Sequence, residues 1–368
     1  MKRYLFIAFL LSIIACNNRN IDYQYFVEKD KGEFFDGIFK DNTAYVVGVR
    51  YHGKNSWDGN LIIYQPDKDS AKSIFFGDTA TEIFRSVENF GKNLLITGSS
   101  YDSTLLRIWI LITDKNGKIL KSHKYSFPSL DAEGIKAILI DKNIYILSSV
   151  YTKIVPPQIF LIKTDTNGNI ITSKYLKINT KTAAKDLCPY KDGFVITGVT
   201  SDINNDDNFF VARINKNLDT LWVKTIKLML NDRGQKITTD GKYIYIAGYT
   251  QSKGSGLSDG WILKFDQNGK LIKDITIGTK YDDWLTGIYL KNNKLTITGI
   301  TMKKNYPHFF IAKLDTNLNI IESYELKTPN KLIFGLNDTY INNQAIISSG
   351  FYFKEGRNKQ GWFFIKKY

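Results

Sequence analysis

A small residue, Gly or Ser, recurs about every fifty residues along this 368-residue chain, always two positions after a β-branched aliphatic residue. The aliphatic residues are Val46, Ile96, Ile146, Ile196, Ile246, Ile297 and Ile347. The small residues are Gly48, Gly98, Ser148, Gly198, Gly248, Gly299 and Ser349. A fixed period of this length indicates repeated supersecondary units, each of which must bury its apolar surface against its neighbours.

Each unit contains four short strand-like runs, as residues 279–327 illustrate. Residues 284–290 are apolar, and residues 295–301 alternate between apolar and polar side chains, which is the period of a β-strand. Residues 309–314 and 319–327 supply two further strands after short turns. The sequence therefore predicts an all-β fold, a seven-bladed β-propeller of four-stranded antiparallel blades, whose strands we name A to D from the centre outward.

The last unit lacks a fourth strand, because the sequence given ends at Tyr368 directly after its third strand. Residues 21–28 alternate in the manner of a strand at the other end of the chain. We expect this segment to complete the last blade and close the ring, which would remove an exposed strand edge. The alternative is that residues 21–28 serve only as a tether.

The turns after the third strands carry the pattern Asp-x-Asn-Gly, beginning at Asp114, Asp165 and Asp266. Position twelve from each Asp is not the Glu that a calcium loop requires, so we interpret the segments as turns and predict neither a metal nor a cofactor. Together with the preceding strand, best seen in residues 259–269, the pattern resembles bacterial exported propeller repeats. The resemblance implies a propeller outside the cytoplasm and implies no activity.

The N-terminus has a basic start at Lys2 and Arg3, an apolar run over residues 4–14 and a small residue before Cys16, which together are typical of a secretory signal. The run is too short to span a bilayer. The tetrad Ile13-Ile14-Ala15-Cys16 resembles the lipobox of bacterial lipoproteins. The resemblance implies a signal peptide over residues 1–15, acylation of Cys16 with palmitate-type chains, a tether over residues 16–20 and a propeller over residues 21–368. The alternative is an ordinary signal peptide that contains a Cys.

Asn17 after the Cys favours anchoring in the outer membrane. The formal net charge is +14, and +12 once Lys2 and Arg3 are removed, which favours acidic partners through long-range attraction. No block of five consecutive basic residues occurs, and an exported lipoprotein is not expected to meet nucleic acid.

No catalytic constellation stands out in the sequence. With Cys16 acylated, Cys188 has no disulfide partner, and we interpret it as a buried structural thiol. The three histidines, His52, His123 and His308, form no cluster in the sequence.

In a propeller, the A–B and C–D turns lie on one face and the longer, more variable B–C and D–A connections on the other, where we expect binding. Near that face, strand A begins with an acidic residue in five units: Glu33, Glu82, Glu133, Asp232 and Asp283. These carboxylates could ring the channel mouth and hold a metal or a cationic group. Alternatively, each accepts backbone hydrogen bonds and ties one blade to the next.

A second candidate set is aromatic and lies at the ends of the B strands and in the loops that follow: Tyr51, Trp57, Tyr101, Tyr151, Tyr249, Tyr306 and Tyr352. Such rings could stack on sugars or bind peptide side chains, or they could only pack between blades. We therefore predict a non-enzymatic cell-envelope lipoprotein that binds an envelope protein or glycan. The alternatives are a polysaccharide-acting enzyme that uses the carboxylates, and a scaffold for the assembly of outer-membrane proteins.

Overall fold

The computed structural model describes residues 24–53, 56–77, 81–101, 103–179, 181–201, 206–303, 306–326, 333–353 and 359–367. The expected signal peptide, Cys16 and the tether over residues 16–20 lie outside the described residues. Within them the chain forms 27 β-strands, a single 3-10 turn at Pro66–Lys68 and no α-helix. No described segment is therefore a helix that is long and apolar enough to cross a membrane.

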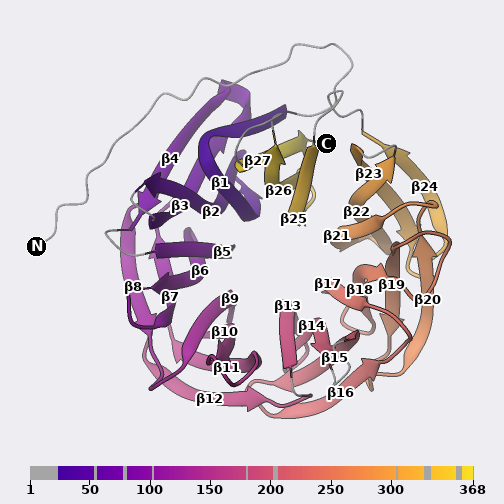
Figure 1. Ribbon diagram of the computed structural model, residues 1–368, viewed down its shortest axis with the longest axis horizontal. Helices are drawn as coiled ribbons and strands as arrows, with labels where there is room; N and C mark the ends of the chain where they lie inside the picture. The colour runs from indigo at the N-terminus through magenta and orange to yellow at the C-terminus, as the bar shows by residue number, and fades with distance from the viewer. Residues whose placement is uncertain are drawn as a thin grey trace, which may run out of the picture.

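Five sheets each contain four consecutive antiparallel strands and stand radially around a common centre (Figure 1). Their strands are β5 (Thr81–Phe90), β6 (Asn93–Tyr101), β7 (Leu106–Thr113), β8 (Ile119–Tyr125); β9 (Asp131–Ile140), β10 (Asn143–Tyr151), β11 (Gln158–Asp165), β12 (Ile170–Leu176); β13 (Lys181–Tyr190), β14 (Gly193–Ser201), β15 (Asp207–Asn215), β16 (Thr220–Ile226); β17 (Asp232–Thr239), β18 (Ile244–Thr250), β19 (Asp259–Phe265), β20 (Leu271–Ile277); and β21 (Asp283–Lys291), β22 (Lys294–Lys303), β23 (Tyr306–Asp315), β24 (Ile320–Glu325). The first strand of each sheet is innermost and the fourth outermost, which is the arrangement of a β-propeller.

A sixth sheet holds seven strands in the order β25-β26-β27-β1-β2-β3-β4. Its strands are β1 (Gln24–Lys40), β2 (Thr43–Gly53), β3 (Ser56–Gln65), β4 (Ser70–Phe76), β25 (Ile333–Ile341), β26 (Ala345–Phe353) and β27 (Lys359–Lys367). The long strand β1 belongs to both halves of this sheet. Its first part pairs with β27, with Gln24 opposite Ile365, and its second part pairs with β2, with Phe34 opposite Gly48.

The core lies between neighbouring sheets rather than within any one of them. One cluster joins Ile74 and Phe76 of the first sheet to Phe84 and Trp109 of the next. Another joins Tyr245 and Ile262 of the sheet β17–β20 to Leu285 and Phe310 of the sheet β21–β24. Each sheet therefore has apolar side chains on both of its faces, because it packs against a neighbour on either side. This explains why the second and third strands of a sheet, such as β6 and β7, are nearly continuous runs of buried residues.

The fifty-residue recurrence of glycine has a steric cause. Every inner strand contains a register shift, such as that between Phe84 and Ser86, which marks a β-bulge. The bulge brings a carbonyl against the second strand, so that a Cβ placed on Gly98 would lie only 1.9 Å from the oxygen of Ile83. The same contact, at 1.9–2.3 Å, recurs at Gly48, Gly198, Gly248, Gly299 and Gly350.

In the last unit, the small residue that faces the bulge lies one position later than the fifty-residue repeat predicts. Gly350, and not Ser349, stands opposite the bulged strand, because Gly350 pairs with Leu336 and its Cβ would meet the oxygen of Gly335 at 2.0 Å. In the third unit Ser148 occupies the position, opposite Gly134.

The Asp-x-Asn-Gly segments are turns, in agreement with the sequence interpretation. Asp114 Oδ1 accepts hydrogen bonds from the backbone N–H of Asn116 at 2.8 Å and of Lys118 at 2.9 Å, and Gly117 has φ +81°. Asp165 and Asp266 use their carboxylates in the same way. In two units Leu218 and Leu318 take the glycine position with positive φ and remain buried.

The A–B and C–D turns gather on one side of the ring, which we call the turn face; for example, Lys216 Nζ of one turn lies 2.6 Å from Asp141 of another. The B–C and D–A connections gather on the opposite side, the loop face, where the N–H of Thr182 donates to the oxygen of Pro157 at 2.9 Å. The described chain enters at the turn face, since Gln24 contacts Tyr64 and Pro66 beside the first C–D turn.

Candidate binding site in the axial cavity

Two adjoining cavities of about 510 and 420 Å³ lie at the centre of the ring, on the side of the loop face. They share four lining residues: Lys185, Gln235, Lys236 and Asn337. Both are lined chiefly by the bulged segments of the inner strands and by the ends of the B strands. The bulges therefore decide which side chains reach the axis.

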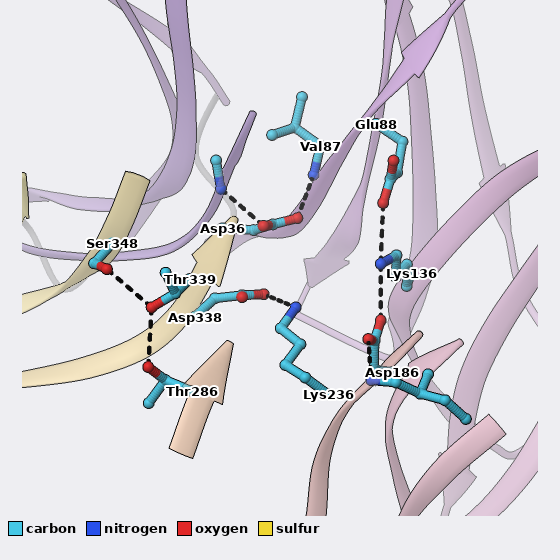
Figure 2. Close-up of polar contacts among 12 residues, drawn as sticks. Asp36, Val87, Glu88, Lys136, Asp186, Lys236, Thr286, Asp338, Thr339 and Ser348 are labelled. Carbon is cyan, nitrogen blue, oxygen red and sulfur yellow. Dashed lines mark hydrogen bonds and ion pairs between the residues drawn. The ribbon is translucent and has the colours of Figure 1, made fainter. Parts of the chain in front are cut away.

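The floor of the larger cavity is charged. One residue after each bulge, the inner strands carry Asp36, Ser86, Lys136, Asp186, Lys236, Gly287 and Asp338. Five of these, together with Glu88, form the axial charge cluster: Asp36, Glu88, Lys136, Asp186, Lys236 and Asp338 (Figure 2). The cluster thus collects charges from inner strands that are about fifty residues apart in the sequence.

In the axial charge cluster three of the four carboxylates pair with the two lysines, and Asp36 accepts from backbone N–H groups instead. Lys136 Nζ lies 2.8 Å from Asp186 Oδ1 and 3.0 Å from Glu88 Oε1, and Lys236 pairs with Asp338. The aspartates also tie adjacent inner strands together, because Asp36 accepts from the N–H of Val87 at 3.0 Å and Asp186 from that of Ile237 at 3.1 Å. The cluster therefore serves as a structural floor rather than as an open ligand site.

Burial and pairing perturb these groups in opposite directions. Burial, assisted by the neighbouring charge of Asp338, raises the pKa of Asp36 well above its ordinary value. Burial also opposes ionisation of Asp186, but the ammonium groups of Lys136 and Lys236 outweigh it and hold the pKa of Asp186 below its usual range. For Lys136, burial is outweighed by Asp186 and Glu88, so its pKa is raised.

Lys185 differs from the floor residues. It is the bulged residue of β13 and borders both cavities. Its side chain is solvent-accessible although protein surrounds it, as expected for a group that projects into a cavity. Among the described residues it forms no hydrogen bond or ion pair. Next to it, Ala183 and Ala184 leave the wall open because their side chains are small.

Two arginines stand near Lys185, each paired with a carboxylate. Arg85 Nε donates to Glu133 Oε1 at 2.8 Å, and Arg233 pairs with Asp207. Burial, followed by the charges of Arg233 and Arg85, lowers the pKa of Lys185. The three cations around this point therefore face only two carboxylates.

The smaller cavity is more apolar. Besides the four shared residues, its lining includes the aromatic side chains Tyr249, Trp284, Phe334 and Phe351. The larger cavity adds Phe35 and Tyr151, and the guanidinium of Arg85 lies 4.5 Å from the ring centre of Phe35. The combined site presents rings, two amides and an ammonium group to one space, which is the usual composition of a small-molecule pocket.

The five carboxylates predicted from the sequence do not form one ring. Glu82, Asp232 and Asp283 begin their inner strands and are buried, whereas Glu33 and Glu133 lie one residue further along. Successive strand residues point to opposite faces, so the two groups are directed apart. Of the five, only Glu133 borders the two axial cavities, and Asp283 lines a separate cavity between β20 and β24.

Each of these carboxylates has an internal partner. Glu33 pairs with Lys359 at 2.5 Å and Glu133 with Arg85 at 2.6 Å. Glu82 accepts from Ser100 at 3.2 Å, Asp232 from Thr250 and from Ser252, and Asp283 from the N–H of Thr279 at 2.7 Å. Only two of these contacts join different units, that of Glu133 with Arg85 and that of Glu33 with Lys359, whereas Glu82 and Asp232 bond side chains of their own unit. The contacts engage all five carboxylates inside the protein and do not favour a catalytic acid–base pair.

The predicted aromatic residues divide between the cavity and the periphery. Tyr151 and Tyr249 line the cavities. Tyr51 and Trp57 pack edge to face at 5.2 Å, with Lys31 over both rings. Tyr101 and Tyr306 are exposed elsewhere on the surface, and Tyr352 packs against the core of the last unit. Only Tyr151 and Tyr249 of the seven aromatic residues therefore reach the axial cavities, and Tyr51 and Trp57 form a separate pair.

Cys188 is a free thiol in the described structure and packs beside the core. Burial raises its pKa to about 12, which leaves it protonated and a poor nucleophile. The described residues contain no group of three or more His, Cys, Asp or Glu side chains arranged to hold a metal ion.

Sequence reasoning did not identify Lys185, Gln235 or Asn337, the bulged residues that line both cavities. A signal was present, because the residue at this position changes from unit to unit: Phe35, Arg85, Ile135, Lys185, Gln235, Thr286 and Asn337. A variable position between two patterned ones is where a repeat protein can place specificity.

Comparison with known proteins supports the fold and nothing finer. No family model and no curated protein matches the chain. Among solved structures it is similar to the polysaccharide lyase Uly1 (11% identity, 97% of this chain and 94% of that one, TM-score 0.56). It also resembles the β-propeller domain of the Trilobed protease from Pyrococcus furiosus (11% identity, 92% and 98%, TM-score 0.52).

A third similar structure is the acylaminoacyl peptidase of Pyrococcus horikoshii (12% identity, 89% of this chain, TM-score 0.50). This chain spans about half of that peptidase, 52% of its length. At such low identity these likenesses show a shared propeller fold alone.

Proposed function

We propose that this protein is a lipid-anchored propeller that binds a glycan in the axial cavity of its loop face. One observation carries the proposal: a cavity at the centre of the ring combines aromatic rings, side-chain amides and an ammonium group without an ion pair among the described residues. Rings bury the apolar faces of sugars, and amides and ammonium groups bind their polar substituents. The likeness to a polysaccharide lyase does not enter this argument, because the identity is 11%.

We also propose that the ring has seven blades and is closed by β1. In support, the seven-stranded sheet divides at β1 into two sets of four strands. One set is β25, β26, β27 and the first part of β1; the other is the second part of β1 with β2, β3 and β4. A register shift between Val27 and Lys31 lies close to the point of division.

The proposed anchor would set the orientation of the propeller. Cys16 precedes Gln24 by eight residues, a span of at most about 29 Å when fully extended. Since Gln24 lies at the turn face, an acylated Cys16 would direct that face toward the membrane. The cavity on the loop face would then open away from the membrane, toward envelope polymers.

The two alternatives from the sequence gain less support. A polysaccharide-acting enzyme was suggested by the ring of carboxylates, and these residues are engaged with internal partners. A scaffold for outer-membrane protein assembly would need an extended protein-binding surface, and no feature of the described residues favours that over the cavity.

The binding proposal is tested with lipid-free protein, residues 21–368, titrated calorimetrically with oligosaccharides prepared from envelope polysaccharide. We expect binding that Tyr151→Ala weakens roughly tenfold through lost ring contact, while Tyr101→Ala, an exposed ring outside the cavities, leaves it unchanged. Absence of any saccharide binding, or equal effects of the two substitutions, would overturn the proposal.

The anchor is tested separately by growing cells with labelled palmitate. The wild-type protein should carry the label and sediment with membranes, and Cys16→Ser should remove both properties. A labelled Cys16→Ser protein would show that the lipid lies elsewhere.

A further inference from the structure

We propose that Lys185 forms an anion-binding subsite in the axial cavity, so that the glycan is an acidic one whose carboxylate or sulfate group docks on this ammonium. The inference rests on the proposed function and specifies its substrate class. Three features carry it: the position of Lys185, its lack of an ion-pair partner among the described residues, and the neighbouring lining.

The position of Lys185 is set by the backbone. It is the residue displaced by the bulge between Ala184 and Asp186, and it borders both cavities. Asp186, the next residue, is committed to Lys136 at 2.8 Å and to the N–H of Ile237 at 3.1 Å. The neighbouring carboxylate is therefore directed to the floor, while the ammonium of Lys185 projects into the space above it.

The charge balance leaves Lys185 uncompensated. Arg85 is paired with Glu133 and Arg233 with Asp207, and the floor lysines are paired within the axial charge cluster. Among the described residues Lys185 has no such partner. Lys185 is thus the one cation of these five without an ion-pair partner among the described residues, although the axial charge cluster below it holds four carboxylates against two lysines.

The Lys185 side chain is exposed to solvent within the cavity, so its ammonium is free to exchange water for an anion, with which it would form a charge-assisted hydrogen bond. The lowered pKa of Lys185 reflects this environment, which arises from burial and from Arg233 and Arg85. An anionic ligand would act in the opposite direction and raise this pKa again.

The remaining lining favours a saccharide as the carrier of the anion. Gln235 and Asn337 are shared by both cavities with Lys185. Gln235 offers an amide to hydroxyl groups, whereas Asn337 offers only its amide oxygen, because its Nδ2 already donates to Glu33 Oε1 at 2.8 Å and to the oxygen of Phe34 at 2.7 Å. Trp284 and Phe351 line the apolar side of the smaller cavity, where the face of a second sugar ring would pack. The net charge of +12 that remains once Lys2 and Arg3 are removed adds a long-range attraction for acidic polymers.

The test compares three probes on lipid-free protein by calorimetry: trigalacturonic acid, the neutral trisaccharide galactotriose, and an acidic tripeptide. The variants are Lys185→Gln and, as a matched control, Lys142→Gln, which removes an exposed lysine from a turn on the opposite face. We expect the wild type and Lys142→Gln to bind the acidic sugar about ten- to a hundredfold more tightly than the neutral one. Lys185→Gln should abolish this preference, so that the acidic and the neutral sugar bind with equal affinity.

Folding is monitored in the same series by the melting temperature. Removing an uncompensated charge should not lower it, so Lys185→Gln should melt at or above the wild-type temperature. If Lys185→Gln loses binding and also melts at a lower temperature, Lys185→Arg separates the two effects. This variant keeps the charge and should restore the preference for the acidic sugar at least in part.

The possible failures are distinguishable. Equal binding of the two sugars by the wild type, or a preference retained in Lys185→Gln, overturns the anion subsite and leaves the proposed function standing. Binding of the acidic tripeptide alone, lost in Lys185→Gln, overturns the saccharide assignment. Binding of no saccharide of any kind overturns the proposed function itself.

Discussion

At the scale of single residues, the axial charge cluster depends on Lys136. Its ammonium is the shared counter-ion of Asp186 and Glu88, and both Lys136 and Asp186 are largely withdrawn from solvent. Breaking a buried ion pair by removing one partner usually costs about 3–5 kcal/mol, because the other charge stays buried. We expect Lys136→Met to lower the free energy of unfolding at neutral pH by about that amount, measured by urea denaturation.

The pH dependence checks the cause of this effect. In the wild type the depressed pKa of Asp186 contributes stability that is present above the unfolded-state pKa of about 3.9 and is lost as the pH falls through the folded-state value. Without Lys136, burial should raise the pKa of Asp186, so the difference between variant and wild type should shrink on acidification. A difference that stays constant between pH 7 and pH 4 would attribute the loss to packing instead.

At the scale of elements, the contact between bulge and glycine explains the repeat. A Cβ on Gly350 would lie 2.0 Å from the carbonyl oxygen of Gly335, a backbone atom that cannot move aside cheaply. We expect Gly350→Ala to destabilise the protein by about 1–3 kcal/mol, as overpacking in a core does. Thermal and urea denaturation measure the change.

The adjacent Ser349 provides the control. Its hydroxyl is buried, with no hydrogen-bond partner among the described residues, so Ser349→Ala should be neutral or slightly stabilising. Comparing the two variants also tests the register of this strand. The fifty-residue repeat of the sequence aligns Ser349 with the glycines, so it would predict the larger loss of stability at Ser349. A larger loss at Ser349 would contradict the placement of Gly350 against the bulge.

At the scale of the whole molecule, the two ends of the described chain meet in one sheet. The first part of β1 covers the edge of β27, and Phe26 stacks on Phe363 with ring centres 5.2 Å apart. Deleting residues 1–31 should remove this cover and expose the unpaired edge. We expect a loss of at least about 3–5 kcal/mol, the cost of removing one buried Phe side chain, and self-association through the free edge.

For the chain of residues 32–368, light scattering measures self-association and urea denaturation measures stability. A chain that lacks only residues 1–20 is the matched control. The control should remain monomeric with unchanged stability. A shorter chain that is equally stable and monomeric would show that the segment is a tether, which was the alternative interpretation of residues 21–28.

The sequence by itself determined the repeat, the strands and the turns. These features depend on backbone bonding over a few residues and on strict steric needs, such as positive φ at Gly117 or close approach at Gly98, and such needs leave a pattern that can be read along the chain. Among the seven aromatic residues that the sequence predicted for binding, two line the axial cavities, Tyr151 and Tyr249, and the others lie elsewhere.

Only the tertiary structure decided which charged groups meet at the axis. Glu33 and Glu82 looked equivalent in the sequence, yet they differ by one position in strand register and therefore point to opposite faces. Lys185 and Asp186 are neighbours, yet the bulge separates them, and the carboxylate is bound by partners about fifty residues away on either side. Whether a side chain is paired or left to meet a ligand depends on such contacts between blades, which no spacing along one strand encodes.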